Sequence, residues 1–140
     1  MTLPLAGTAR ESPSVLRIYV FGVGVLLLAQ GSLSLLVRAT GRDPHETTRL
    51  LSDPWHGAIH VVWGVLLLAI LARSRDPVVV EWTAIAFGVF YLGFLALGLL
   101  VHHPFGLMID GPENVFHAVV GGLSLTLGLR ALARRRAMAG

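Results

Sequence analysis

The stretch DPWHGAIHVVWG, residues 53–64, decides the fold of this chain. Asp53 before Pro54 is typical of a helix start, because the carboxylate accepts from free amides of the first turn and proline has no amide to leave unpaired there. The residues that follow, up to position 71, are almost all apolar. About 20 such residues form a helix long enough to cross the ~30 Å hydrocarbon core of a bilayer. We therefore predict a transmembrane helix that begins at Pro54.

The chain of 140 residues contains three further apolar blocks of this length. Hydrophobic residues make up 54% of the chain, charged residues make up 14%, and the mean hydropathy is +0.72. These values are typical of membrane proteins and leave no room for a soluble domain. We predict an all-α fold, a four-helix transmembrane bundle built from two tandem hairpins, with helices at about 15–37, 54–72, 78–101 and 113–132.

The charged residues indicate how the bundle lies in the membrane. All 11 basic residues are arginines, and they flank the apolar blocks instead of forming a basic face, which argues against a nucleic-acid partner. In a four-helix topology, eight of them lie on the same side of the membrane as both termini, and the other three lie on the opposite side, in the loop 38–53. Because cytoplasmic ends carry the excess of Arg, we predict a multi-pass protein of the inner (plasma) membrane with both termini cytoplasmic. Residues 1–14 and the Arg-rich residues 133–140 are then its tails.

The second and fourth apolar blocks begin alike. DPWHGAIHVVWG at position 53 aligns with DGPENVFHAVVG at position 110, and the coinciding residues include Asp53 with Asp110, His60 with His117, and Gly64 with Gly121. The first and third blocks share the tripeptide FGV at 21–23 and 87–89. We predict a duplicated hairpin whose repeat axis runs along the membrane normal, since both copies have the same orientation.

Paired histidines at the starts of the second and fourth of four helices resemble a family of small bacterial membrane proteins classed as a domain of unknown function. The resemblance covers residues from about 15 to 132. In that family the second helix usually starts with Asn-x-x-His, where this chain has His56-Gly57-Ala58-Ile59-His60. The resemblance implies the four-helix fold and brings no activity with it.

The histidines are the main candidates for a site. Under this topology all six lie on the outer side: His45, His56, His60, His102, His103 and His117. Imidazole nitrogens on facing helices can ligate a metal ion or haem iron, so His60 and His117 are candidate cofactor ligands. His56 precedes His60 by one turn and can bind the same metal. The alternatives for these histidines are structural hydrogen bonding, proton transfer and pH sensing.

Three other polar residues fall inside the predicted helices. Gln30 is expected to face neighbouring helices, because an amide in hydrocarbon needs a hydrogen-bond partner. The hydroxyl of Tyr91 is expected to bond to another helix. Glu81 lies near the cytoplasmic edge, where we expect it to pair with Arg73 or Arg75.

These features leave three functions open. The first is a structural or accessory component of a membrane complex, which forms a homo-oligomer or binds another membrane protein through Gly and Ala faces. The second is a metal- or haem-binding membrane protein ligated by His60 and His117. The third is a small transport unit that uses Gln30 or Tyr91. The chain has no cysteine, which excludes thiolate sites and disulfides, and no hydrolase or phosphate-loop motif, so we expect no enzymatic activity.

Overall fold

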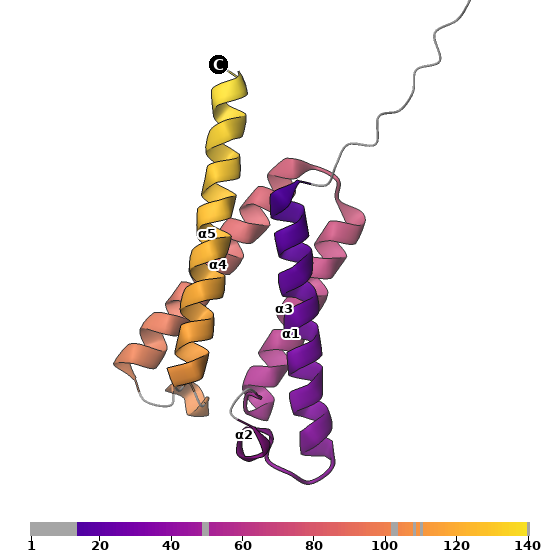
Figure 1. Cartoon of the computed structure of the whole chain (residues 1–140), viewed down its shortest axis with the longest axis vertical. Helices are drawn as coiled ribbons and strands as arrows, with labels where there is room; N and C mark the ends of the chain where they lie inside the picture. The colour runs from indigo at the N-terminus through magenta and orange to yellow at the C-terminus, as the bar shows by residue number, and fades with distance from the viewer. Residues whose placement is uncertain (1–13, 49–50, 102–103, 108, 110, 140) are drawn as a thin grey trace, which may run out of the picture.

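The computed structural model consists of helices throughout the part of the chain that it describes, residues 14–48, 51–101, 104–107, 109 and 111–139. Four helices are long and apolar enough to cross a membrane, which confirms the predicted all-α architecture of membrane-spanning helices. They are α1 (Val15–Ala39), α3 (Pro54–Arg73), α4 (Pro77–Leu100) and α5 (Gly111–Ala139) (Figure 1). Two single-turn helices, α2 (Pro44–Thr47) and η1 (Pro104–Gly106), lie in the connections.

Polar side chains cap the helix starts. Asp53 Oδ1 accepts from the amides of Trp55 at 3.0 Å and His56 at 3.1 Å, so the predicted cap of α3 is confirmed. Asp76 caps α4 in the same way, accepting from the amide of Val78 at 2.8 Å. Each cap satisfies amides that a helix start otherwise leaves unpaired. Asp110, which aligns with Asp53 in the sequence, lies outside the described residues.

The last helix is longer than the sequence pattern predicts. We expect an end near residue 132, followed by an Arg-rich tail, but α5 continues to Ala139. Its final turns contain alanine, arginine and leucine, which are strong helix formers, and no proline or glycine interrupts them. The end of the apolar block therefore marks a change of environment along α5 and not the end of the helix.

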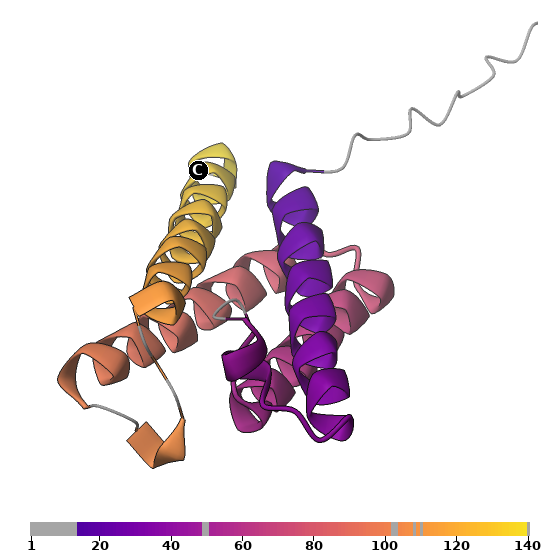
Figure 2. The same ribbon diagram turned by 60° about the horizontal axis from the view of Figure 1, so that its bottom comes forward.

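The helices pack closely in two pairs, α1 with α3 and α4 with α5 (Figure 2). Glycines bring their backbones together: a Cβ on Gly64 of α3 would lie 2.6 Å from the backbone nitrogen of Leu28 in α1. A Cβ on Gly121 of α5 would lie 3.1 Å from the backbone nitrogen of Leu92 in α4. Small residues permit this close approach inside a bilayer, where van der Waals packing holds helices together.

A second set of glycine contacts, further along the helices, also matches between the two helix pairs. A Cβ on Gly24 of α1 would meet the side chain of Leu68 in α3 at 3.1 Å. A Cβ on Gly88 of α4 would meet the backbone nitrogen of Leu125 in α5 at 2.6 Å. Gly24 thus occupies the position in the first pair that Gly88 occupies in the second.

The register predicted from the FGV tripeptides is therefore wrong. Phe21 is 56% exposed whereas Phe87 is 1% exposed, and a Cβ on Gly22 would meet nothing within 4 Å. Gly24, two residues after Gly22, is the counterpart of Gly88. The tripeptides share composition but face different surroundings, because a shift of two residues turns a helical side chain by about 200°.

Both ends of the bundle can be followed in Figure 1. The start of α1 and the end of α5 lie at one end of the molecule, and α3 and α5 begin at the other. At the first end Arg17 donates to the carbonyls of Leu71 at 2.7 Å and Ser74 at 2.8 Å. These bonds satisfy two carbonyl groups at the C-terminal end of α3.

The same end holds a pair between α4 and α5. The Nε of Arg135 lies 2.9 Å from Glu81 Oε2. The predicted pairing of Glu81 with Arg73 or Arg75 is wrong, because the continued helix α5 carries Arg135 alongside α4.

Candidate metal centre

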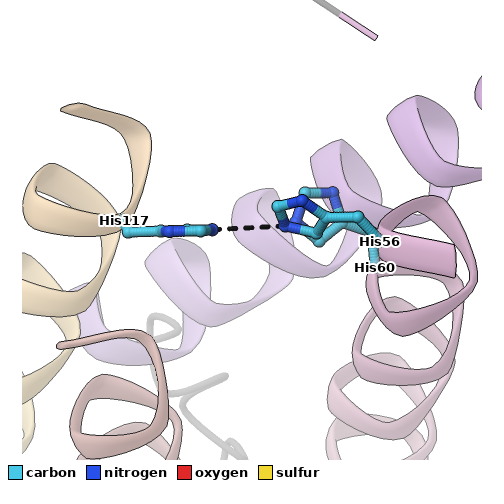
Figure 3. A group of neighbouring side chains, drawn as sticks. All are labelled: His56, His60 and His117. Atoms are coloured by element: carbon cyan, nitrogen blue, oxygen red, sulfur yellow. Dashed lines mark hydrogen bonds between the residues drawn. The ribbon is translucent and has the colours of Figure 1, made fainter. Parts of the chain in front are cut away.

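Three histidines from the two helix pairs meet near the starts of α3 and α5 (Figure 3). His56 and His60 lie on one face of α3, one turn apart, and His117 points toward them from α5. Each offers one ring nitrogen, and these nitrogens all lie within 4.8 Å of one another. Their side chains are buried, with exposed fractions of 1%, 3% and 1%. We call these three residues the histidine triad.

Gln30 of α1 fixes the ring of His60. Its amide nitrogen donates to Ser52 Oγ at 2.8 Å, so its oxygen faces His60 Nδ1 and accepts from it. The predicted contact of Gln30 with other parts of the bundle is thus confirmed. Because the amide oxygen can only accept, the proton of a neutral His60 lies on Nδ1 and the lone pair lies on Nε2. His60 Nε2 is buried and has no hydrogen-bond partner among the described residues.

Glu113 of α5 fixes the ring of His56. Glu113 Oε2 lies 2.8 Å from His56 Nδ1, and the two side chains are 10% and 1% exposed. An ionised carboxylate accepts only, so this contact favours the tautomer of His56 with its proton on Nδ1, and Nε2 of the same ring faces His117 Nε2. The sequence pattern alone does not identify Glu113 as a site residue. The signal was present in the aligned helix starts, where Glu113 occupies the position of His56.

His117 completes the triad. Its Nε2 lies 3.3 Å from His56 Nε2, and its Nδ1 is buried without a hydrogen-bond partner among the described residues. Aromatic rings surround it, with the centroid of Tyr91 at 5.3 Å and that of Phe94 at 5.8 Å. A buried polar atom without a partner costs about 1–3 kcal/mol. Three ring nitrogens of the triad, His56 Nδ1, His60 Nε2 and His117 Nδ1, are buried without a hydrogen bond among the described residues, and of these only His56 Nδ1 has a close ionic contact, with Glu113.

The spacing of the nitrogens can be compared with that of known kinds of centre. A tetrahedral zinc ion with Zn–N bonds of about 2.0–2.1 Å separates its nitrogen ligands by about 3.3–3.4 Å. The two Nε2 atoms of His56 and His117 lie 3.3 Å apart. A haem needs axial ligands on opposite faces of a flat macrocycle. Here His56 packs against both other rings, with centroids 4.6 Å from His60 and 5.2 Å from His117, so the arrangement fits a single ion better.

A cavity of about 340 Å³ adjoins the triad. Its lining combines two members of the triad, three other polar residues and three apolar residues: His60, His117, Gln30, Ser52, Glu113, Leu26, Pro112 and Phe116. None of these lining residues is an arginine. A group bound in this cavity therefore meets two imidazoles and a carboxylate but no positive side chain.

The ring of Tyr91 packs against the triad, with its centroid 5.3 Å from that of His117. The hydroxyl of Tyr91 is buried without a hydrogen-bond partner among the described residues, so the bond predicted from it to another helix is not formed there. Trp63 packs edge-on against Phe87 at 5.2 Å, which is core packing between α3 and α4. Two further histidines of the sequence analysis, His102 and His103, lie outside the described residues, as does the side chain of His45.

Comparison with known proteins yields no matching family, no matching curated protein and no matching solved structure. The resemblance to the bacterial domain of unknown function stays a prediction.

Proposed function

We propose that this chain is a metal-binding protein of the inner membrane, in which the histidine triad binds one Zn²⁺ ion between the two helix pairs. The observation that carries the proposal is the convergence of three buried imidazoles, two of which have Nδ1 beside an oxygen of a neighbouring side chain. His56 Nδ1 faces the Glu113 carboxylate at 2.8 Å and His60 Nδ1 faces the Gln30 amide oxygen. Metal-ligating histidines are oriented in this way, because the outer acceptor fixes the tautomer and makes the ring a stronger ligand.

The ligand type favours zinc among the common ions. Neutral imidazoles suit Zn²⁺, Cu²⁺, Fe²⁺ and Ni²⁺, whereas Mg²⁺ and Ca²⁺ prefer oxygen ligands and Cu⁺ prefers sulfur. Three protein nitrogens leave the fourth position of a tetrahedral ion to an exchangeable ligand. The proposal concerns binding of the ion, and we assign no reaction to it.

The surroundings of the triad support its place on the outer side of the membrane. Seven of the arginines that the structure describes lie at the end where α1 begins and α5 ends: Arg17, Arg73, Arg75, Arg130, Arg134, Arg135 and Arg136. Such an excess favours the cytoplasm. The triad lies toward the opposite end, and the matching glycine contacts of the two helix pairs support an origin as two tandem hairpins.

The test is the metal content of the untagged protein, purified in mild detergent and titrated with Zn²⁺. We expect one Zn²⁺ per chain in the wild type and less than about a tenth of that in His56→Ala, His60→Ala and His117→Ala. His45→Ala serves as the matched control, because His45 lies outside the triad. Circular dichroism shows whether each variant keeps its helices.

Two outcomes would contradict the proposal. A wild-type protein that takes up no Zn²⁺ would leave the three histidines as hydrogen-bonding residues between the helix pairs. Uptake that survives in all three helical variants would place the ion elsewhere in the chain. His117→Gln, which keeps a polar side chain against α3, is measured alongside so that a folding defect in His117→Ala is not taken for loss of a ligand.

A further inference from the structure

We infer that Arg130 and Arg134 of α5 bind the phosphate of an anionic phospholipid in the leaflet at that end of the bundle. The inference goes beyond the metal site and does not depend on it. Two of the seven described arginines at this end have partners within the protein: Arg17 donates to carbonyls at the end of α3, and Arg135 pairs with Glu81. The other five are exposed and form no salt bridge among the described residues: Arg73, Arg75, Arg130, Arg134 and Arg136.

The acidic side chains that the structure describes at this end are already engaged. Glu81 Oε2 lies 2.9 Å from the Nε of Arg135, and Asp76 caps α4. Arg130 and Arg134 are four residues apart, so they lie on one face of α5 and repel each other. An anion held between the two guanidinium groups removes this repulsion, and phosphate binds guanidinium through two parallel hydrogen bonds.

The depth of the two arginines places them at the head groups. A Cβ on Gly128 would lie 2.8 Å from Ile85 Cγ1 and 3.1 Å from the carbonyl oxygen of Glu81, so this part of α5 is level with the second and third turns of α4. Arg130 lies half a turn further along α5, and Arg134 lies about 6 Å beyond it. An exposed arginine near the end of a membrane-spanning helix directs its charge to the head groups, because a charge in hydrocarbon is costly.

Apolar side chains on the same face of α5 fit the acyl chains of such a lipid. Leu123 lies seven residues before Arg130, and Val119 lies eleven residues before it. Both spacings return to the same side of a helix with 3.6 residues per turn. Their side chains are 48% and 52% exposed. A free phosphate ion would contact the arginines alone, whereas a phospholipid also covers this apolar stripe, so we assign the phosphate to a lipid.

The charge at this end selects an anionic lipid over a zwitterionic one. Seven described arginines lie here beside two described acidic residues, Asp76 and Glu81. A zwitterionic head group such as phosphatidylcholine also has a phosphate, but this excess of positive charge repels its ammonium group. An arginine beside an anionic head group favours binding by about fivefold.

The experiment compares two lipids with the same acyl chains. The full chain in mild detergent is mixed with equal amounts of phosphatidylglycerol and phosphatidylcholine, and the lipid that it retains is measured by native mass spectrometry. We expect the wild type to retain phosphatidylglycerol in at least about tenfold excess. Arg130→Gln/Arg134→Gln should lower this excess by at least about fivefold. Equal retention of the two lipids by the wild type, or an unchanged excess in the double variant, overturns the inference.

The matched control is Arg73→Gln/Arg75→Gln, which removes the same charge from the same end of the bundle but leaves α5 intact. In detergent no charged bilayer surrounds the protein, so an arginine matters only where the lipid is bound. The control should change the excess by less than about twofold, and an equal loss in both double variants overturns the proposed location. If circular dichroism shows that Arg130→Gln/Arg134→Gln has lost its helices, the two single variants decide, each with an expected loss of at least about twofold.

A further arm separates the lipid from a soluble anion. Glycerol phosphate, which has the phosphate but no acyl chains, is added at about tenfold excess over phosphatidylglycerol. It should leave the retained lipid unchanged, because it makes no contact with the apolar stripe. Displacement of the lipid by glycerol phosphate would overturn the lipid assignment.

Discussion

Replacing Glu113 with glutamine tests the contact that orients His56. The substitution removes the negative charge behind the His56 ring but keeps the shape of the side chain and one oxygen acceptor. Glu113 Oε2 lies 2.8 Å from His56 Nδ1, and both side chains are at most 10% exposed, so water screens the charge poorly. Loss of such an outer partner weakens metal binding by about 10–100-fold, which corresponds to about 1.4–2.8 kcal/mol. We expect Glu113→Gln to raise the Kd for Zn²⁺ by this factor.

The assay is a competition titration in detergent, in which the protein and a chromophoric chelator share a limiting amount of Zn²⁺. Glu46→Gln is the matched control, because Glu46 is an exposed glutamate of α2, and its affinity should stay within about twofold of the wild type. A double-mutant cycle with His56→Ala then shows whether Glu113 influences the affinity for Zn²⁺ through His56. With His56 absent, Glu113→Gln should change the residual affinity little, because the two side chains act as one unit.

A wild-type affinity in Glu113→Gln would refute the reasoning, since the carboxylate would then have no influence on the ion. An effect of the same size with and without His56 would also refute it, because the charge would then act on the ion directly and not through the imidazole.

Three further predictions concern the packing of the helices, each measured as the free energy of unfolding in mixed detergent. Gly64→Ala should destabilise the protein by about 1–3 kcal/mol because the new Cβ meets the backbone of α1 at 2.6 Å, whereas Gly122→Ala, with nothing within 4 Å, should not destabilise it. Tyr19→Phe removes two hydrogen bonds of 2.9 Å between α1 and α5, one donated to the Val120 carbonyl and one formed with the Ser124 hydroxyl, and should cost about 0.5–1.5 kcal/mol; an unchanged stability would mean that the helix pairs do not depend on this link. Arg135→Gln should cost about 1.5–3 kcal/mol because it leaves the buried carboxylate of Glu81 without its cation, and most of this loss should disappear when Glu81→Gln is present as well.

The sequence by itself determined the helices and their starts. Four apolar blocks of membrane-spanning length are sufficient for this, because a backbone in hydrocarbon must satisfy its hydrogen bonds within the helix. Asp53 before Pro54 marked a start that the structure places at the same residue. The neighbourhood of His56 and His60 also followed from the sequence, since residues four apart on a helix share a face.

The end of α5 could not be predicted from the apolar pattern. The change from apolar residues to arginines predicts where the helix leaves the hydrocarbon, but helix propensity does not depend on that boundary. As α5 continues to Ala139, Arg135 reaches Glu81 of α4. The prediction of Arg73 or Arg75 as the partner of Glu81 relied on nearness in the chain, whereas the observed pair depends on two helices that lie side by side.

Only the tertiary structure decided which residues share the site. The sequence named His117 as a candidate beside His60 but did not indicate that Glu113 faces His56 or that Gln30 faces His60. The physical reason is that spacing within a helix is fixed by its 3.6 residues per turn. The rotation and axial offset of one helix against another are instead set by close glycine contacts, and apolar patterns do not show which glycines make them. The tripeptide with Gly22 suggested one register, and the contacts of Gly24 set another.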